Sequence, residues 1–183
     1  MQTISEEYRE MNRILHEKHE YYGAGRVTSK WYPLIMQLVG TLNARSILDY
    51  GAGKCKLAEA LSHLMVNSYD PSIPAIADPP EPADLVVCLD VLEHIEPELL
   101  DNVLDDLKRL AIKGVFLTVS TRPAGKFLSD GRNAHLIQKP ANWWLPKLME
   151  RWNVQMFASS EKDSEFYIYG LTEQKQQTEK AAA

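Results

Sequence analysis

A short apolar run that ends in an acid and two glycines places the tightest constraint on how this chain folds. Residues 46–55 read S-I-L-D-Y-G-A-G-K-C, with Asp49 near the end of a predicted buried strand and Gly51 and Gly53 in the turn behind it. In open parallel α/β sheets, ligands bind beyond the carboxyl ends of the strands, and the first strand-to-helix turn needs glycine where the backbone approaches the ligand. The stretch therefore predicts a ligand-binding turn, although a plain tight turn explains the two glycines equally well.

Strand and helix patterns alternate along the rest of the chain. Strands are predicted over residues 45–50, 66–69, 83–89 and 115–120, and helices over 4–20, 29–42, 57–65, 98–111 and 143–151. Two last strands, 154–158 and 166–171, are expected to form an antiparallel edge, and Gly114 is expected to end the helix at 98–111. This order predicts an α/β fold in which a mostly parallel sheet lies between two layers of helices.

Composition bounds the size and the surroundings of the protein. The chain has 183 residues, 45% of them hydrophobic and 25% charged, which suits one globular domain. The formal net charge of −5 argues against a broad electrostatic grip on nucleic acid or on an anionic membrane. No apolar run approaches the roughly 20 residues that span a bilayer, and the N-terminus is too charged for a signal peptide. A cytoplasmic protein with no membrane partner is expected, and its two cysteines, Cys55 and Cys88, are expected to stay reduced.

A second acid lies at the end of the next predicted strand. Asp70 closes the run N-S-Y-D about 20 residues after the glycine turn, where a carboxylate accepts hydrogen bonds from both hydroxyls of a ribose. Asp49 is placed to meet a cationic group instead. A nucleoside with an amino acid arm has both features, whereas a dinucleotide usually needs a third glycine where this chain has Cys55. The pattern therefore favours a nucleoside with a charged arm.

Three motifs taken together resemble those of class I S-adenosylmethionine-dependent methyltransferases. They are S-I-L-D-Y-G-A-G, Y-D-P and A-D-L-V-V-C-L-D-V-L-E-H-I-E-P, and the resemblance runs over residues 44–120. It implies a Rossmann-like three-layer sandwich and S-adenosyl-L-methionine as the methyl donor. At the matching positions, it implies that the methionine end is held by Asp49, Gly51 and Gly53, the ribose by Asp70, and that Leu89 and Asp90 flank the sulfonium. Cys55 replaces the family's usual glycine.

The chain is also shorter than the family pattern between its second and fourth strands. Only 13 residues separate Asp70 from Asp84, where the family usually has a helix, a strand and another helix. The prolines in this gap, Pro71, Pro74, Pro79, Pro80 and Pro82, forbid a regular helix. A reduced third strand is therefore expected over residues 75–78, with Ala77 or Asp78 beside the adenine and a more open cofactor pocket.

A further polar group follows the predicted strand at 83–89. Asp90, Glu93 and His94 are spaced i, i+3 and i+4, so they share one face if a helix starts there. His135 lies in the loop after the strand at 115–120, which comes to the same rim of the sheet. Carboxylates and imidazoles bind Mg²⁺, Mn²⁺ or Zn²⁺, so these four residues are predicted metal ligands. The alternative is that they cap the helix or line the cofactor pocket.

The same set resembles the site pattern of small-RNA 3′-terminal 2′-O-methyltransferases, with Asp90 in place of the first glutamate. It is also similar to that of ubiquinone-pathway O-methyltransferases, where a histidine loop is followed by a K-P-A stretch, here residues 139–141. A hydroxyl acceptor must lose its proton, which a metal promotes or a histidine accepts. His94, His135 and Glu93 are therefore the candidate catalytic residues.

Three parts of the chain are expected to differ in role. Residues 1–43 are predicted to form a helical lid, residues 44–172 the methyltransferase core and residues 173–183 a disordered tail. The residues expected to fold over the pocket are Tyr21, Tyr22, Gly23 and Arg26. Those expected to offer charges to an anionic substrate group are Arg122, Lys126 and Arg132. Three histidines are expected to be exposed on helices: His16, His19 and His63.

The resulting hypothesis is a single-domain methyltransferase that acts on a small-molecule acceptor at a hydroxyl, with or without a divalent metal. Two alternatives stay open. One is methylation of an RNA or nucleotide 2′-hydroxyl, which the acidic composition disfavours. The other is a non-catalytic regulator that binds S-adenosylmethionine, which Cys55 and the shortened middle of the chain allow. The acceptor and the oligomeric state do not follow from the sequence.

Overall fold

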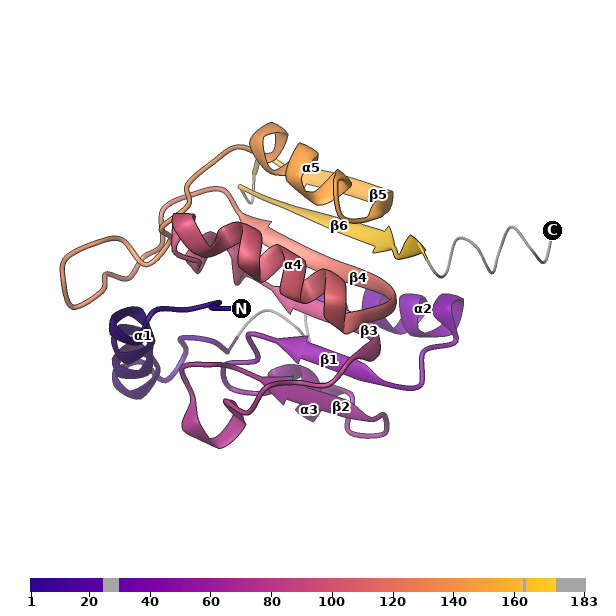
Figure 1. The fold of residues 1–183 in the computed structure, drawn as a ribbon, viewed down its shortest axis with the longest axis horizontal. Helices are drawn as coiled ribbons and strands as arrows, with labels where there is room; N and C mark the ends of the chain where they lie inside the picture. Colours follow the sequence, from indigo (N-terminus) through magenta and orange to yellow (C-terminus); the bar gives the residue numbers. More distant parts are fainter. Residues whose placement is uncertain (25–29, 163, 174–183) are drawn as a thin grey trace.

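The computed structural model describes residues 1–24, 30–162 and 164–173, and one sheet runs through this part of the chain (Figure 1). Its strands are β1 Ile47–Tyr50, β2 Val66–Tyr69, β3 Ala83–Leu89, β4 Ala111–Ser120, β5 Asn153–Ser160 and β6 Glu165–Leu171. The helices are α1 Glu6–Lys18, α2 Tyr32–Leu42, α3 Lys56–Ala60, α4 Leu100–Leu110 and α5 Ala141–Met149. The 3₁₀ helices η2 Pro74–Ile76, η3 Leu92–His94 and η4 Pro97–Leu99 lie between β2 and α4. Arg26 and, beyond Glu173, the predicted tail lie outside the described residues.

The strands follow the order β2-β1-β3-β4-β6-β5 across the sheet. Neighbours from β2 to β4 are parallel, whereas β6 is antiparallel to both β4 and β5. The predicted mostly parallel sheet with an antiparallel edge is confirmed, and β6 is the strand inserted between β4 and the edge. The register pairs Tyr50 of β1 with Tyr69 of β2. The chain therefore leaves both strands at the same level, and the residues that follow them share one rim.

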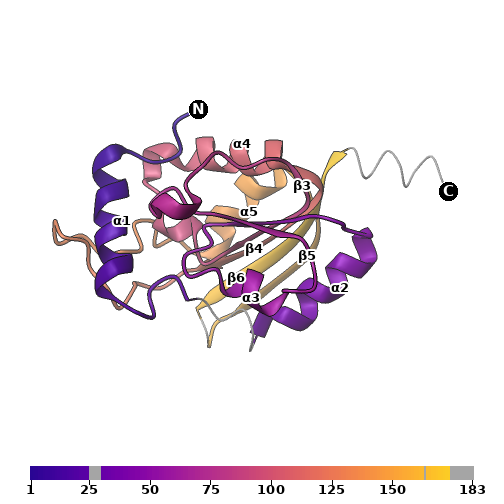
Figure 2. The ribbon, with the colours of Figure 1, turned by 90° about the horizontal axis from the view of Figure 1, so that it is seen from below.

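Helices cover both faces of the sheet, as Figure 2 shows for α4 and α2. One core cluster joins α4 and α5 to the first face through residues such as Val86, Leu104 and Trp144. A second cluster joins α2 to the opposite face, with Ile35 packed in the same cluster as Leu85 of β3. Neighbouring residues of β3 thus point into different layers, which explains its unbroken apolar sequence. The predicted three-layer α/β sandwich is confirmed.

The predicted third strand at residues 75–78 is wrong. The chain forms the 3₁₀ helix η2 at Pro74–Ile76 instead, and no strand of the described residues lies beyond β2. The backbone N–H of Asp70 donates to the carbonyl oxygen of Ile76 at 3.0 Å. This bond folds the proline-rich segment back over the end of β2. No strand forms beside β2, because proline has no backbone N–H to donate to a neighbouring strand.

Two other local predictions are wrong. Gly114 does not end a helix but lies within β4, where a Cβ would come within 2.8 Å of the carbonyl oxygen of Gly170 on β6. The glycine therefore allows two strands to approach closely. The helix predicted over 57–65 ends at Ala60, because Leu61 leaves the helical conformation with φ −106° and ψ 32°. The remaining residues form the turn into β2.

The two N-terminal helices have different positions. Helix α2 belongs to the core layer described above, whereas α1 lies beyond the carboxyl ends of the strands, beside the loop that follows β4 (Figures 1 and 2). A separate apolar cluster joins α1 to this loop through residues that include Tyr8, Met11, Leu128 and Ala134. Segments from opposite halves of the sequence thus form a cap over the rim of the sheet. Within the described residues, the helices are too short and too polar for any to cross a bilayer.

Candidate functional site

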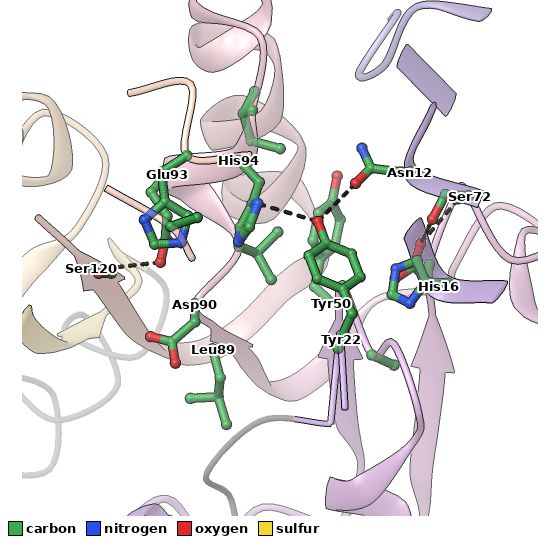
Figure 3. Close-up of a pocket in the computed structure, with 18 of the residues that line it drawn as sticks. Asn12, His16, Tyr22, Tyr50, Ser72, Leu89, Asp90, Glu93, His94 and Ser120 are labelled. Carbon is green, nitrogen blue, oxygen red and sulfur yellow. Dashed lines mark hydrogen bonds and ion pairs between the residues drawn. The ribbon is translucent and has the colours of Figure 1, made fainter. Parts of the chain in front are cut away.

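A cavity of about 680 Å³ lies between this cap and the carboxyl ends of the strands. Figure 3 shows its wall, to which α1, the turn after β1, the end of β2, the end of β3 and η3 all contribute side chains. Of the residues predicted for the site, those that line the cavity are Asp49, Gly51, Asp70, Leu89, Asp90, Glu93, His94 and His135. Two predicted site residues lie outside the lining: Gly53, which is buried, and Asp78, which is exposed beyond the end of η2.

Asp70 is the most fully hydrogen-bonded acid of the cavity. Its carboxylate accepts the backbone N–H of Gly53 at 3.1 Å, and it accepts the N–H and the hydroxyl of Ser72 at 3.0 and 2.6 Å. These donors fix the carboxylate at the end of β2 and tie it to the glycine turn after β1. The predicted ribose ligand and the predicted glycine turn are therefore parts of one hydrogen-bonded unit.

Asp49 lies deeper, with only 5% of its surface exposed. Burial first, and the nearby Asp70 second, raise the pKa of its carboxyl to about 7. A carboxyl in this state is poised to ionise when a cationic group binds beside it. That behaviour suits the role expected for Asp49, which is to face the charged arm of a nucleoside.

His16 is a residue that the sequence interpretation placed wrongly. It was expected to be exposed, but only 9% of its surface is, and its Nε2 lies 3.8 Å from a carboxylate oxygen of Asp70. Burial lowers the pKa of His16, while the charge of Asp70 acts in the opposite direction. His16 shares the inner face of α1 with Asn12, and both line the cavity. Helix α1 thus brings a histidine directly to the predicted ribose site.

The glycine turn is shaped by close backbone packing. Gly51 has φ +79°, and a Cβ there would lie 2.4 Å from a methyl carbon of Val91. Cys55, at the family's third glycine position, has φ +54° and so takes the left-handed conformation that glycine adopts most easily. The turn keeps the backbone path that a third glycine would allow, at an energetic cost to the folded state.

A second group of polar side chains lies at the end of β3. Glu93 is fully buried in η3, and its Oε1 accepts the backbone N–H of Ser120 at 3.0 Å. Its Oε2 is buried and has no hydrogen-bond partner in the described part of the chain. Burial, followed by the charge of Asp90, raises the pKa of Glu93 well above its usual value. An unpartnered buried carboxylate oxygen is costly, so this atom needs a proton or a cation.

Two histidines meet Glu93 from different segments. His94 follows it in η3, and His135 lies in the loop after β4, which is held against η3 by a bond from the Ile137 N–H to the Glu93 carbonyl at 2.9 Å. The His94 and His135 rings pack edge to face, with centroids 4.6 Å apart. Ligand atoms of Glu93, His94 and His135 all lie within 4.8 Å of one another. The structure therefore brings three of the four predicted metal ligands together.

Asp90 is the exception. Its carboxylate accepts the hydroxyl of Thr118 at 2.9 Å and is not part of that cluster. The backbone of Asp90 has φ +54°, and its N–H also bonds to the Thr118 hydroxyl in β4, so both groups of Asp90 contact this strand. The i, i+3, i+4 spacing brings the three side chains to one face only in an α-helix, whereas the helix that forms is a 3₁₀ turn over Leu92–His94.

The remaining geometry of the cluster suits a cation. His135 has its Nδ1 2.6 Å from the carbonyl oxygen of Arg122, so Nδ1 carries the proton and Nε2 keeps a lone pair. Burial lowers the pKa of His135, and burial together with His135 lowers the pKa of His94 to about 3, so both rings are neutral. One orphaned carboxylate oxygen beside two neutral imidazoles is a donor set that fits a divalent metal.

Helix α1 also holds His94 in place. The hydroxyl of Tyr8 donates to the His94 carbonyl oxygen, and the hydroxyl of Tyr22 lies 3.3 Å from its Nδ1 (Figure 3). Tyr22 in turn donates to Oδ1 of Asn12 at 3.0 Å. The sequence had marked Tyr22 for the lid but gave no sign of Tyr8, Asn12, Ser72 or Ser120, whose roles arise only when distant segments meet.

Neither a family model nor a curated protein matches this sequence. Solved structures do share its fold. The 1,6-didemethyltoxoflavin-N1-methyltransferase of Burkholderia thailandensis, with bound S-adenosylhomocysteine, matches with a TM-score of 0.63 at 16% identity over 94% of this chain and 92% of that one. Magnesium protoporphyrin IX methyltransferase of Synechocystis PCC 6803, with bound SAH, matches with a TM-score of 0.57 at 14% identity over 94% and 89%.

A putative O-methyltransferase of Nostoc punctiforme PCC 73102 is similar over a smaller part. The TM-score is 0.53 at 14% identity, and the match covers 76% of this chain but only 55% of that one. The chain thus spans little more than half the length of this relative. At these identities the comparisons establish the fold, which is that of class I S-adenosylmethionine-dependent methyltransferases, as the motifs predicted.

Proposed function

We propose that this protein transfers a methyl group from S-adenosylmethionine to a hydroxyl of a small acceptor, with a divalent cation held by Glu93, His94 and His135. One observation carries the proposal. A single cavity is lined by the acids suited to a nucleoside, Asp49 and Asp70, and by the cluster suited to a cation. A methyl donor and an activated acceptor need this adjacency, because the transfer requires in-line approach at short range.

The cofactor half of the proposal rests on Asp49, Asp70 and the glycine turn. Ribose hydroxyls are donors that suit the carboxylate of Asp70, and the ammonium of the methionine arm suits Asp49, whose raised pKa falls when a cation binds beside it. Structures with the same fold contain S-adenosylhomocysteine, which supports this choice of nucleoside.

The cation half rests on the donor set. Two imidazoles and one carboxylate favour Mn²⁺ or Zn²⁺ over Mg²⁺, which prefers oxygen ligands alone. A bound cation would lower the pKa of the acceptor hydroxyl. With the cation bound, both imidazoles serve as its ligands and the acceptor's proton passes to solvent; without the cation, His94 or His135 is the candidate base. As the oxygen–carbon bond forms and the sulfur–carbon bond breaks, that proton must leave. Such assistance matters for a hydroxyl and much less for a free amine, so we favour oxygen as the acceptor atom.

The proposal is tested in two measurements. Calorimetric titration with S-adenosylhomocysteine tests the cofactor, and micromolar binding is expected. A methyl-release assay with S-adenosylmethionine then screens small phenols, catechols, nucleotides and short RNAs, in Mn²⁺ or Zn²⁺ and again after chelation. Transfer to a small hydroxyl compound that chelation reduces supports the proposal. Tight nucleoside binding without transfer to any acceptor would favour the regulator, and transfer to RNA alone would favour the nucleic-acid alternative.

A further inference from the structure

The loop after β4, residues 121–140, carries two basic side chains to the mouth of the cavity. Arg122 and Lys126 both line it. Figure 1 shows this loop beside α1, beyond the carboxyl ends of the parallel strands. It is the segment that also supplies His135. Any acceptor that reaches the Glu93–His94–His135 cluster must therefore pass or contact this loop.

The loop has a defined conformation that fixes where these charges lie. The side chain of Asn133 accepts the Ala124 N–H and donates to the Ala124 carbonyl, both at 2.9 Å, and it also accepts the His135 N–H at 2.9 Å. The Ala134 N–H donates to the carbonyl oxygen of Lys126 at 3.0 Å. Arg122 and Lys126 are thus braced by the same bonds that position His135.

The next feature is the pairing of these two cations within the described residues. Among the described residues, no ion pair involves Arg122 or Lys126, although the carboxylates of Asp90 and Glu165 line the same cavity. Arg132, on the same loop, differs in this respect, since its guanidinium pairs with Asp130 at 2.6 Å. Arg122 and Lys126 are instead exposed at the cavity and form no ion pair in the described part of the chain, so their charges are available to a ligand.

The space and the contacts around Arg122 and Lys126 also suit a bound anion. Gly125 lies between the two cations and lines the cavity, and a Cβ added there would meet no atom within 4 Å. The Nδ1 of His135 lies 2.6 Å from the carbonyl oxygen of Arg122, so Arg122 is adjacent to the reaction cluster. An anion held at the loop would therefore lie near His135 without displacing any protein group.

We propose that Arg122 and Lys126 form an anion subsite for the acceptor, so that the methylated molecule carries a carboxylate or phosphate close to its reacting hydroxyl. This inference deepens the proposed function and rests on it for the identity of the ligand. The chemistry shared by the two sources is a planar or tetrahedral oxyanion, which a guanidinium and an ammonium bind together by charge-assisted hydrogen bonds.

The experiment measures anion binding without requiring turnover. The protein, saturated with S-adenosylhomocysteine, is titrated with inorganic phosphate and separately with benzoate, at constant ionic strength, while the amide and arginine Nε–H signals of the loop are followed by NMR. Saturable binding of one probe is expected, and that probe identifies the source. The double variant Arg122→Gln, Lys126→Gln should weaken it at least about tenfold, because the loss of even one charge-assisted bond costs about that much.

Arg132→Gln is the matched control, since it removes a cation from the same loop that is already paired. It should bind the probe as the unchanged protein does. The inference is overturned if neither probe saturates, if the double variant binds as before, or if the control loses binding equally. It is also overturned if the double variant instead loses S-adenosylhomocysteine, because the cations would then hold the carboxylate of the nucleoside's own arm. Anion binding in a protein that transfers no methyl group would sink the proposed function and leave the subsite standing.

Discussion

Gly23 and Gly53 pack backbone against backbone. A Cβ on Gly53 would lie 2.4 Å from the carbonyl oxygen of Gly23, and that oxygen also accepts the Lys54 N–H at 2.9 Å. Gly53 has φ +49°, so both its conformation and its contact favour glycine. Gly53, predicted to let the backbone approach the cofactor, therefore also lets the N-terminal segment pack against the turn after β1. The cap and this turn depend on the same residue.

The variant Gly53→Ala tests this contact. It should lower the free energy of unfolding by about 1–3 kcal/mol, because the new methyl group meets fixed backbone and the left-handed φ is strained. Urea denaturation measures the change. Gly40→Ala is the control, since Gly40 lies within α2 with open space around it and should gain up to about 1 kcal/mol from better helix propensity. Equal stability of the two variants would contradict the packing argument.

Sequence patterns were sufficient for the sheet and its layers. Strand β3 is buried on both faces and reads as a continuous apolar run, and α4 places Leu100, Leu104 and Leu107 on one buried face. Such patterns arise from burial, so they can be recognised in the sequence before the fold is known. The segment from Asp70 to Ala83 was not predictable in this way, because its path depends on the Asp70–Ile76 backbone bond and on prolines that exclude regular structure without specifying a replacement.

Cys55 provides a second stability test. Replacing it with glycine should stabilise the protein by about 0.5–1 kcal/mol, because glycine adopts the left-handed conformation at φ +54° without a Cβ penalty. The gain is partly offset by the greater entropy of glycine in the unfolded chain. Urea denaturation of Cys55→Gly and of Cys55→Ala separates the two effects, since the alanine variant keeps the penalty. A glycine variant no more stable than the alanine variant would show that the strain is absent.

Site residues at the ends of strands could be predicted from the sequence. Site residues whose position depends on contacts between distant segments could not. Asp49 and Asp70 end parallel neighbours, so their meeting at one rim follows from topology. His16 gave a different result. Its side of α1 is decided by the contact between α1 and the loop after β4, some 110 residues later, which no local periodicity contains. Asp90 lies outside the Glu93–His94–His135 cluster for a similar reason, since a 3₁₀ turn forms where the spacing predicts an α-helix.

The acid at the end of β2 yields a binding prediction. Asp70→Asn keeps the shape of the side chain but removes the charge that accepts hydrogen bonds from Gly53 and Ser72. Affinity for S-adenosylhomocysteine should fall about 10- to 100-fold, as expected for lost charge-assisted bonds to a ribose. Asp78→Asn is the matched control, since Asp78 is exposed and outside the cavity, and its affinity should not change. Calorimetry reports both, and equal losses in the two variants would exclude the assigned ribose position.

Asp49 yields a pH prediction. Its pKa of about 7 means that the free protein holds a proton there below pH 7, which a cationic arm must displace. Affinity for S-adenosylhomocysteine should rise by up to about tenfold per pH unit toward pH 7 and then level off. In Asp49→Asn that rise should disappear. Binding that is independent of pH in the unchanged protein would show that Asp49 does not face the charged arm.

The same residue affects stability with the opposite trend. The unfolded chain releases the Asp49 proton near pH 4, but the folded protein keeps it until about pH 7. Folding therefore binds a proton in this interval, and the free energy of unfolding should fall as pH rises from 4 to 7, by at most about 1.4 kcal/mol per unit from this group. Urea denaturation across this interval should show a shallower decline in Asp49→Asn, and an identical slope in both proteins would contradict the assigned burial.

Metal binding at Glu93 is the last prediction, and it depends on an atom rather than on a motif. Within the described residues, Oε2 of Glu93 is a buried oxygen without a hydrogen-bond partner. Glu93→Gln places an amide of the same shape there and removes the charge that a cation requires. Mn²⁺ or Zn²⁺ affinity, measured by titration of the metal-free protein, should fall at least about 100-fold. Losing a metal ligand costs more affinity than losing a residue that only orients one, and the latter already costs up to about 100-fold. Glu98→Gln is the control, since Glu98 is exposed, five residues further along, and outside the cluster.

The Glu93→Gln variant should also be more stable than the unchanged protein in chelator at pH 8, because burial disfavours the charged form of Glu93, which is the form that high pH favours. Unchanged metal affinity together with unchanged stability would mean that Oε2 of Glu93 has another partner, and that the Glu93–His94–His135 cluster does not bind a cation.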